Sequence, residues 1–172
     1  SRAAVAGGVT SYMEMPNTKP QTTTLELLEE KYALAATRSM ANYSFYLGAT
    51  NQNIRELVKV NPADVCGVKV FMGSSTGNML VDDLDTLNRI FAEVPTLIAT
   101  HCEDEPTIQK NLSYYKNIYG DNIGCEFHPF IRSEEACFKS SSFAVEMAVK
   151  YGTRLHVLHL STAREMSLFS NS

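Results

Sequence analysis

Short apolar runs alternate with amphipathic segments along the whole chain of 172 residues. The apolar runs are continuous rather than strictly alternating, which is typical of strands in a covered parallel sheet. In one segment between them, Leu25, Leu28, Tyr32 and Ala35 recur at helical spacing. The pattern therefore predicts five strands, over residues 8–15, 43–49, 65–72, 95–100 and 153–160.

Helices are expected between these strands, and residue types at their ends support the assignment. Thr23 or Thr24 can cap the first long helix, Ser133 can cap the last one, and Gly152 can end it. A stretch rich in glycine, asparagine and proline near 119–132 is predicted to be an insertion within a single domain, 1–172. The helices are expected over residues 23–40, 53–60, 82–93, 105–119 and 133–151.

Spacing along the chain bears on the architecture of this α/β fold. Lys69 and His101, each near a strand end, lie 32 positions apart. A unit of about 30 residues is typical of a (β/α)₈ TIM barrel of about 250 residues. We therefore expect a partial barrel of about five parallel βα units. The alternative, favoured by chain length alone, is a complete open doubly wound sheet.

Composition and charge narrow the class of protein. A net charge of −4 without a basic run argues against a nucleic-acid partner. No apolar stretch approaches the ~20 residues that would span a membrane. The cysteines show no CxxC spacing, which predicts reduced thiols and a cytoplasmic setting; they are Cys66, Cys102, Cys125 and Cys137.

Three potential metal-binding residues follow or end predicted strands: Lys69, His101 and His159. The carboxyl ends of parallel strands meet at the edge where ligands bind. Neutral imidazole is the commonest protein ligand for a transition metal. Two histidines at matching strand ends, with a lysine at a third, favour a metal site over separately buried structural histidines.

Strand parity predicts different roles for the neighbouring histidines. If His159 points into the site, Leu155 and Val157 share its face of the strand, because strand side chains alternate. His156 is then expected to face the helices in a structural role. His128, in the insertion, is expected to be a loop histidine.

Lys69 lies in an apolar strand, where a charged amine is costly to bury. Desolvation favours the neutral amine, which is nucleophilic and can take up CO₂ to form a carbamate. Such a group can bridge two metal ions. The alternative is a lysine that extends to the sheet edge or pairs with Glu103 or Asp104.

Four segments together resemble the amidohydrolase superfamily and, within it, the dihydroorotase family. They are MPNTKP (15–20), GVKVFM (67–72), HCED (101–104) and HLST (159–162). Each motif alone is weak, but four in order with barrel spacing are specific. The resemblance runs from about Gly7 to Thr162, and it implies that the chain corresponds to barrel strands 2–6.

The resemblance implies a zinc-dependent hydrolase of pyrimidine biosynthesis that interconverts N-carbamoyl-L-aspartate and L-dihydroorotate. Two zinc ions activate water and polarise the ring carbonyl. Lys69 would be the carboxylated bridge, and His101 and His159 would bind one metal. Asn17 would hydrogen-bond the substrate's carboxylate, and the less favoured alternative is a turn residue between two prolines. A cytoplasmic enzyme, possibly a homo-oligomer, is expected.

The chain departs from the family pattern at two places. The HxH pair of strand one is expected upstream of Ser1, and the catalytic aspartate of strand eight downstream of Ser172. Glu103 and Asp104 are expected to support His101 rather than to replace these ligands. No catalytic acid or base is therefore assigned within the segment, and the segment alone is expected to be inactive.

Other functions remain open from the residues. A related amidohydrolase could act on hydantoin or allantoin, or the fold could serve as a non-catalytic dihydroorotase-like scaffold. An open α/β domain could bind an anion through the loop 73–78. That loop lacks a lysine at phosphate-binding spacing, so this last reading has little support.

Overall fold

The computed structural model describes residues 1–73 and 77–170. Within them, five parallel strands form one sheet whose spatial order follows the chain. This confirms the predicted number and direction of the strands. They are β1 (Ser11–Glu14), β2 (Asn42–Gly48), β3 (Gly67–Phe71), β4 (Ile98–His101) and β5 (Leu155–Val157).

Helices connect the strands, and their ends follow the predicted caps. The side chains of Thr24 and Ser133 accept hydrogen bonds from backbone N–H groups in the first turns of α2 and α7, and Gly152 ends α7 in the left-handed conformation. The helices are α1 (Arg2–Ala6), α2 (Leu25–Arg38), α3 (Ile54–Leu57), α4 (Leu84–Glu93), α5 (Glu105–Tyr119), α6 (His128–Ile131) and α7 (Glu134–Tyr151), with 3₁₀ turns η1 (Cys125–Phe127) and η2 (Arg164–Leu168).

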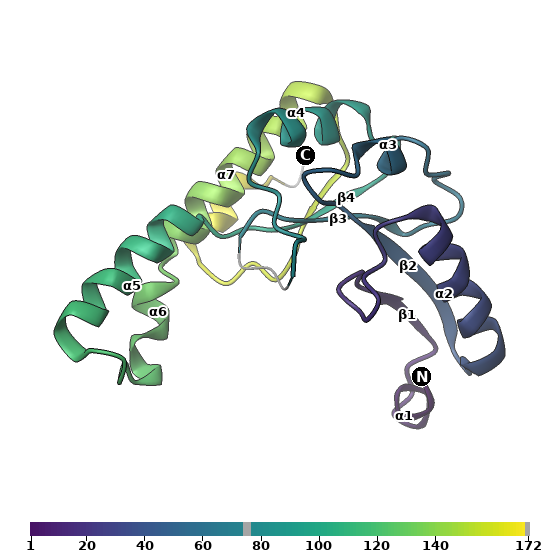
Figure 1. Ribbon diagram of the computed structural model, residues 1–172, viewed down its shortest axis with the longest axis horizontal. Coiled ribbons are helices and arrows are strands. Elements are labelled where there is room, and N and C mark those ends of the chain that lie inside the picture. Colours follow the sequence, from purple (N-terminus) through teal and green to yellow (C-terminus); the bar gives the residue numbers. More distant parts are fainter. Residues whose placement is uncertain (74–76, 171–172) are drawn as a thin grey trace.

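The sequential strand order corresponds to a segment of a (β/α)₈ barrel. In a doubly wound sheet the strand order reverses at a switch point, and it does not reverse here. The helices α2, α3, α4 and α7 gather on one side of the sheet (Figure 1). The open doubly wound alternative is therefore wrong, and the partial barrel is confirmed.

One hydrophobic core lies between the sheet and these helices. Val68, Val70 and Ile98 from the middle strands are completely buried in it. The opposite, inner face of the sheet carries a layer in register across four strands: Gly48, Lys69, Ala99 and His156. The core is completed by side chains of the covering helices: Leu28, Leu57, Leu87, Ile90, Phe91, Ala144 and Met147.

Two segments differ from the sequence-based expectation. The last strand was expected over 153–160 but ends at Val157, and its ladder with β4 closes with the Leu158 N–H bonded to the Thr100 carbonyl. His159 then takes a φ of 40°, which turns the chain out of the strand.

The insertion near 119–132 is partly helical rather than a simple loop. It contains η1 and α6, and α6 packs against α5 to form an arm that projects from the sheet (Figure 1). The rings of Tyr115, Tyr119 and Phe127 hold this arm together. The glycine and proline residues of this stretch predicted its turns, but they did not predict its short helices.

Half of the expected anion-binding loop, 73–78, lies outside the described residues. The helix after it begins at Leu84, with the Asp83 side chain accepting a hydrogen bond from the Thr86 N–H. None of the helices in the described part of the chain is both long and apolar enough to cross a membrane.

Candidate metal centre

The three predicted residues all lie toward the carboxyl edge of the sheet. Lys69 is in β3 on the inner face, and His101 is the last residue of β4, in register with Phe71. His159 follows β5 by two residues. Parallel strands bring these positions to a common edge because their carboxyl ends point the same way.

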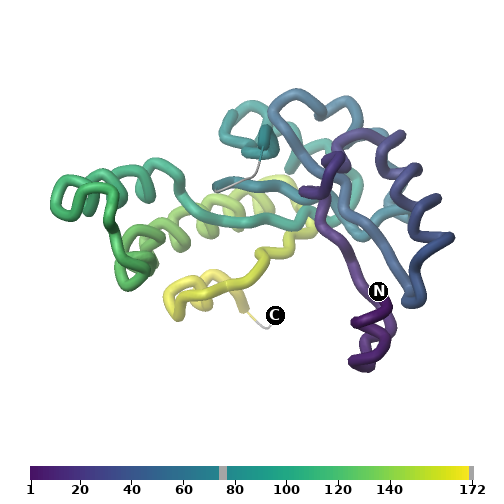
Figure 2. Tube along the Cα trace, turned by 60° about the horizontal axis from the view of Figure 1, so that its bottom comes forward, coloured from purple at the N-terminus to yellow at the C-terminus, as the bar shows by residue number. Residues whose placement is uncertain are grey.

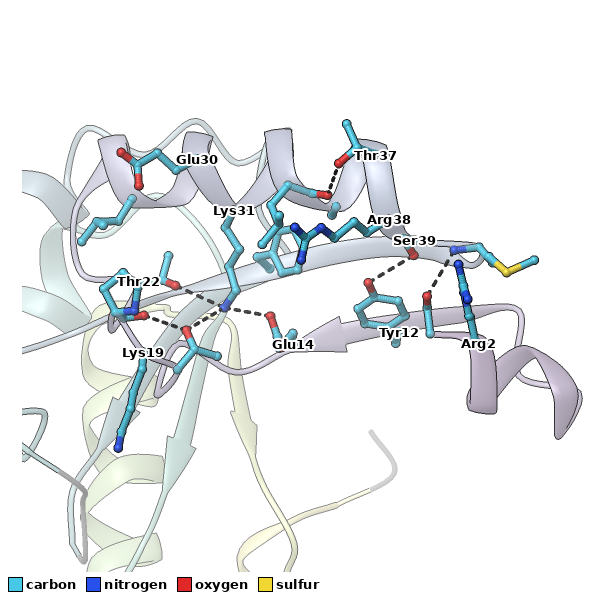
Figure 3. A pocket seen from close by; sticks show the side chains of 18 of the residues that line it. Arg2, Tyr12, Glu14, Lys19, Thr22, Glu30, Lys31, Thr37, Arg38 and Ser39 are labelled. Atoms are coloured by element: carbon cyan, nitrogen blue, oxygen red, sulfur yellow. Dashed lines mark hydrogen bonds and ion pairs between the residues drawn. The ribbon is translucent and has the colours of Figure 1, made fainter.

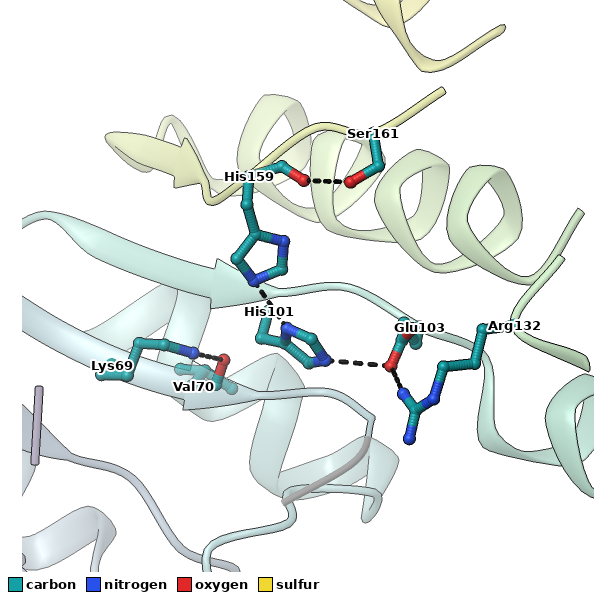
Figure 4. A network of polar contacts seen from close by, with 7 residues as sticks. All are labelled: Lys69, Val70, His101, Glu103, Arg132, His159 and Ser161. Atoms are coloured by element: carbon teal, nitrogen blue, oxygen red, sulfur yellow. Dashed lines mark hydrogen bonds and ion pairs between the residues drawn. The ribbon is translucent and has the colours of Figure 1, made fainter. Parts of the chain in front are cut away.

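The two histidines converge on each other. His101 Nδ1 and His159 Nε2 are 2.8 Å apart, and the rings meet edge to face with centroids 4.7 Å apart (Figure 4). The residues come from positions 58 apart in the sequence. Tertiary structure therefore brings two imidazole nitrogens together, within a small shift of the positions that two ligands of one metal ion take.

Glu103 fixes the protonation of the His101 ring. Its Oε2 atom lies 3.1 Å from His101 Nε2, on the side of the ring away from His159. A carboxylate only accepts hydrogen bonds, so in the neutral imidazole Nε2 carries the proton and the lone pair of Nδ1 faces His159. Such a carboxylate contact orients a histidine that binds a metal.

Arg132 in turn holds Glu103. Its Nη1 atom contacts the same Oε2 atom, and the Glu103 side chain is only 11% exposed. Arg132 follows α6, so the inserted arm contributes to the site through this contact (Figure 4). Sequence reasoning missed Arg132, because its partner lies 29 positions away and no local motif connects the two.

Lys69 is buried, with 2% of its surface exposed. Its Nζ atom donates to the Val70 carbonyl at 3.0 Å and lies 3.6 Å from the centroid of the Phe71 ring. Burial lowers the pKa of the Lys69 amine to about 7. A large fraction of the amine is therefore neutral at neutral pH, and extension of the side chain to the sheet edge is excluded.

The other carboxylate considered for Lys69 has a different role. Asp104 caps α5 by accepting from the Thr107 N–H, and it also pairs with Lys139 at 2.9 Å. These contacts, led by the hydrogen bonds from Thr107, hold the pKa of Asp104 below its usual value despite its partial burial.

The predicted parity of the last strand is wrong. Leu155 and Val157 pack against the core on the helix side, and His156 shares the inner face with Lys69 through Ala99. The alternation predicted from His159 fails because the backbone leaves the strand geometry before His159, at its positive φ. His156 is exposed rather than packed under the helices.

Asn17 lies in the loop that follows β1 and is exposed. Lys31 of α2 holds this loop, donating to the Met15 carbonyl, Thr18 Oγ1 and Thr22 Oγ1 at 3.2–3.3 Å. Lys31 also pairs with Glu14 at 2.9 Å (Figure 3). These contacts join the loop to α2, and the side chain of Asn17 stays exposed.

A large cavity lies away from the histidines. It has a volume of about 1210 Å³ and lies between β1, α2 and the start of the chain, with Tyr12, Lys31 and Arg38 in its lining (Figure 3). Its lining includes neither histidine of the pair nor Lys69. This cavity is therefore separate from the candidate metal centre.

Two cysteine thiols, those of Cys102 and Cys137, have raised pKa values. Burial raises the pKa of the Cys102 thiol, and Cys102 belongs to the helix-side core. Burial, with the Glu165 and Glu103 carboxylates, raises the pKa of Cys137 to about 11. Both thiols are therefore protonated at neutral pH in the metal-free chain.

The donor set fits part of a zinc site. Two imidazole nitrogens aimed at one point suit zinc, which takes four ligands. No group of three histidine, cysteine, aspartate or glutamate side chains that could hold a metal occurs within residues 1–73 and 77–170. The described residues therefore supply two ligands, and a complete site needs others.

Comparison with known proteins finds relatives that the chain matches over only part of their length. The chain is 30% identical to a dihydroorotase of Methanosarcina mazei over 98% of its length and 36% of that protein. It is 32% identical to an L-hydantoinase of Paenarthrobacter aurescens over 94% of its length and 36% of that protein. No family model matches the chain.

A solved structure of an L-hydantoinase from Arthrobacter aurescens has the same fold. It superposes with a TM-score of 0.89 at 29% identity, over 97% of this chain and 38% of that one. The chain thus spans little more than a third of the relatives it matches.

Proposed function

We propose that this chain, which belongs to the amidohydrolase family as a partial segment, contributes the central part of the metal centre of a cyclic amide hydrolase. The observation that carries the proposal is the pair of nitrogens, His101 Nδ1 and His159 Nε2, 2.8 Å apart at the carboxyl edge of a partial barrel. Glu103 and Arg132 support the pair by fixing the His101 ring.

Zinc is the metal that we propose for this site. His101 and His159 would hold one ion, and Lys69, as its carbamate, would supply an anionic oxygen donor on the same face of the sheet. Burial favours the neutral amine that takes up CO₂, because it lowers the pKa of the amine to about 7 and leaves a nucleophilic lone pair. A bound zinc supplies Lewis-acid activation of water and of an amide carbonyl.

Dihydroorotase is the activity that we propose for the full-length protein, acting on N-carbamoyl-L-aspartate and L-dihydroorotate in pyrimidine biosynthesis. The MPNT segment at 15–18 and several dihydroorotases among the curated relatives support this substrate. Asn17, exposed in a loop held by Lys31, would hydrogen-bond the substrate carboxylate. The setting that we propose is cytoplasmic.

A second candidate is hydantoin hydrolysis. It is supported by the 32% identity with an L-hydantoinase and by the TM-score of 0.89 to an L-hydantoinase structure. Both candidates open a cyclic amide, so they share the metal centre and differ in the groups that contact the substrate. Asn17 is the residue whose role separates them.

Substrate assays on the full-length protein test the proposal. We expect turnover of L-dihydroorotate that falls at least about 100-fold in His101→Ala and His159→Ala, because each substitution removes a metal ligand. His128→Ala, in the arm, serves as the control and should keep the activity. Turnover of hydantoin alone would favour the second candidate, and no turnover of any cyclic amide would favour a non-catalytic scaffold.

A further inference from the structure

We propose that Glu165 is a positioning residue for His159, holding the segment that carries this histidine against α7. The proposal rests on the proposed function, because it assigns His159 a ligand role. Glu165 lies six positions after His159, at the second position of η2, and the segment runs beside α7 (Figure 2). No sequence motif used above includes it.

The carboxylate of Glu165 bridges two elements. Its Oε1 atom accepts from Ser141 Oγ of α7 at 2.6 Å, and its Oε2 atom accepts from Thr162 Oγ1 at 2.8 Å. Thr162 belongs to the segment directly after His159. Each oxygen therefore takes one hydroxyl, one from the helix and one from the segment, so the side chain joins them.

Glu165 is 3% exposed, and Ser141 is completely buried. Burying a carboxylate is costly unless hydrogen bonds or a cation compensate it. No ion pair to Glu165 occurs within the described residues, and the neighbouring Arg164 lies over the Phe138 ring instead. The two hydroxyls are thus the compensation that the structure provides, and loss of either weakens the bridge.

His159 needs such support because its backbone is unusual. Its φ of 40° is in the left-handed region, which non-glycine residues disfavour. Ser161 Oγ donates to the His159 carbonyl at 2.8 Å, and the Glu165 N–H donates to Thr162 Oγ1 at 3.4 Å. The bridge to α7 anchors this turn, and the turn points the His159 ring at His101.

Cobalt binding to the full-length protein tests the proposal, with Co²⁺ as a spectroscopic probe of the site. We expect Glu165→Ala to weaken Co²⁺ binding about 10–100-fold, as loss of supporting contacts does at other metal sites. Glu165→Gln should stay within about threefold of the parent, because its amide can accept one hydroxyl bond and donate to the other hydroxyl. If Glu165 only stabilised the fold, Co²⁺ affinity would follow the folding stability of each variant. A loss in Glu165→Ala and a recovery in Glu165→Gln, both at unchanged folding, therefore indicate a positioning role.

Ser141 offers a second test and a matched control. Ser141→Ala removes one side of the bridge and should weaken Co²⁺ binding, while Ser142→Ala removes a neighbouring buried hydroxyl that has no hydrogen-bond partner in the described structure. If Glu165→Ala does not fold, Ser141→Ala carries the measurement. Unchanged Co²⁺ binding in Ser141→Ala, or an equal loss in Ser142→Ala, would overturn the proposal.

A separate variant, His159→Ala, distinguishes failure of the proposed function from failure of the positioning role of Glu165. If His159→Ala leaves Co²⁺ binding unchanged, His159 is not a ligand and the proposed function is wrong. The positioning role is then measured by hydrogen exchange of the amides of residues 159–163 in the metal-free protein. Faster exchange in Glu165→Ala but not in Glu165→Gln supports the bridge, and equal rates in all three proteins reject it.

Discussion

At the scale of single residues, Lys69 places an amine where a positive charge is costly. The pKa of its amine is lowered by burial to about 7 in the folded chain, against 10.5 for the unperturbed side chain. Between these values the unfolded chain binds a proton that the folded chain does not bind. Stability therefore rises with pH from about 7 to about 10.5, and below about 7 the full penalty is present.

Replacing Lys69 with methionine should remove this pH dependence. We expect Lys69→Met to be more stable than the parent at pH 7 in metal-free, CO₂-free full-length protein. The difference should shrink toward pH 10, by at most about 1.4 kcal/mol per pH unit. Urea denaturation at pH 7, 8, 9 and 10 measures it. A difference that stays constant over this range would show that the amine is charged in the folded protein.

Arg132 supports Glu103, and this contact gives a second prediction. Arg132→Met leaves the Glu103 carboxylate, 11% exposed, without this guanidinium, so its hold on His101 should weaken. We expect zinc affinity to fall about 10-fold in a competitive chelator titration. Arg89→Met, which breaks an exposed pair with Glu93, is the matched control and should leave zinc affinity unchanged. Equal affinities in the two variants would contradict the role of Arg132.

The places of the potential metal-binding side chains could be predicted where an apolar run in the sequence marks the strand. The strand-end positions of Lys69, His101 and His159 follow from apolar runs, because the fold places carboxyl ends together. The face of His156 could not be predicted, since a single positive φ at His159 breaks the strand alternation. Arg132 reaches Glu103, and Glu165 reaches Ser141, through tertiary contacts that no local pattern records.

At the scale of elements, the loops after β3 and β4 approach each other closely. A Cβ atom on Gly73 would overlap the backbone carbonyl of Glu103, which cannot move aside as a flexible side chain can. Glycine at this position thus lets the loop after β3 lie against the segment that orients His101. The close approach links one strand-end loop to the next.

Gly73→Ala should therefore displace Glu103 and destabilise the fold. We expect a loss of about 1–3 kcal/mol in the free energy of unfolding, typical of overpacking, together with weaker zinc binding. Gly7→Ala is the control, because a Cβ there meets only ordinary contacts and φ is negative. Thermal unfolding and zinc titration of both variants measure the effect. Parent-like stability in Gly73→Ala would show that the loop can adjust.

Element order was more predictable than element length. Five strands and the major helices appear where periodicity placed them, and α5 has the predicted bounds, 105–119. The last strand is shorter, and the insertion holds short helices, because both depend on contacts with distant parts of the chain. Caps such as Ser133 were predictable because they act within one turn.

At the scale of the whole molecule, the described sheet has two open edges. β1 pairs only with β2, and β5 pairs only with β4. Unpaired strand edges are templates for association with other strands. A closed barrel removes such edges, so the isolated sheet should behave differently from the same sheet within a barrel.

The isolated 172-residue chain should therefore associate or aggregate. Size-exclusion chromatography with light scattering over a range of concentrations measures this, and we expect species larger than a monomer. A monomer with one cooperative unfolding transition would show that the partial barrel is stable alone.

The same chain should not hydrolyse L-dihydroorotate, even with added zinc and bicarbonate. Its described residues bring together two imidazoles but no group of three metal-binding side chains of the histidine, cysteine or carboxylate type. A sensitive assay of the isolated chain, with the full-length protein as the positive control, measures this. Activity above that of a His101→Ala variant of the same chain would show that the centre is complete within it.

The central claim is that His101 and His159 bind one metal ion together. Anomalous diffraction at the zinc edge, from crystals of the full-length protein, tests it most directly. We predict a peak about 2.0–2.1 Å from both His101 Nδ1 and His159 Nε2, with the two nitrogens no longer hydrogen-bonded to each other. A zinc peak elsewhere in the barrel, with the two nitrogens still 2.8 Å apart and joined by a hydrogen bond, would contradict it.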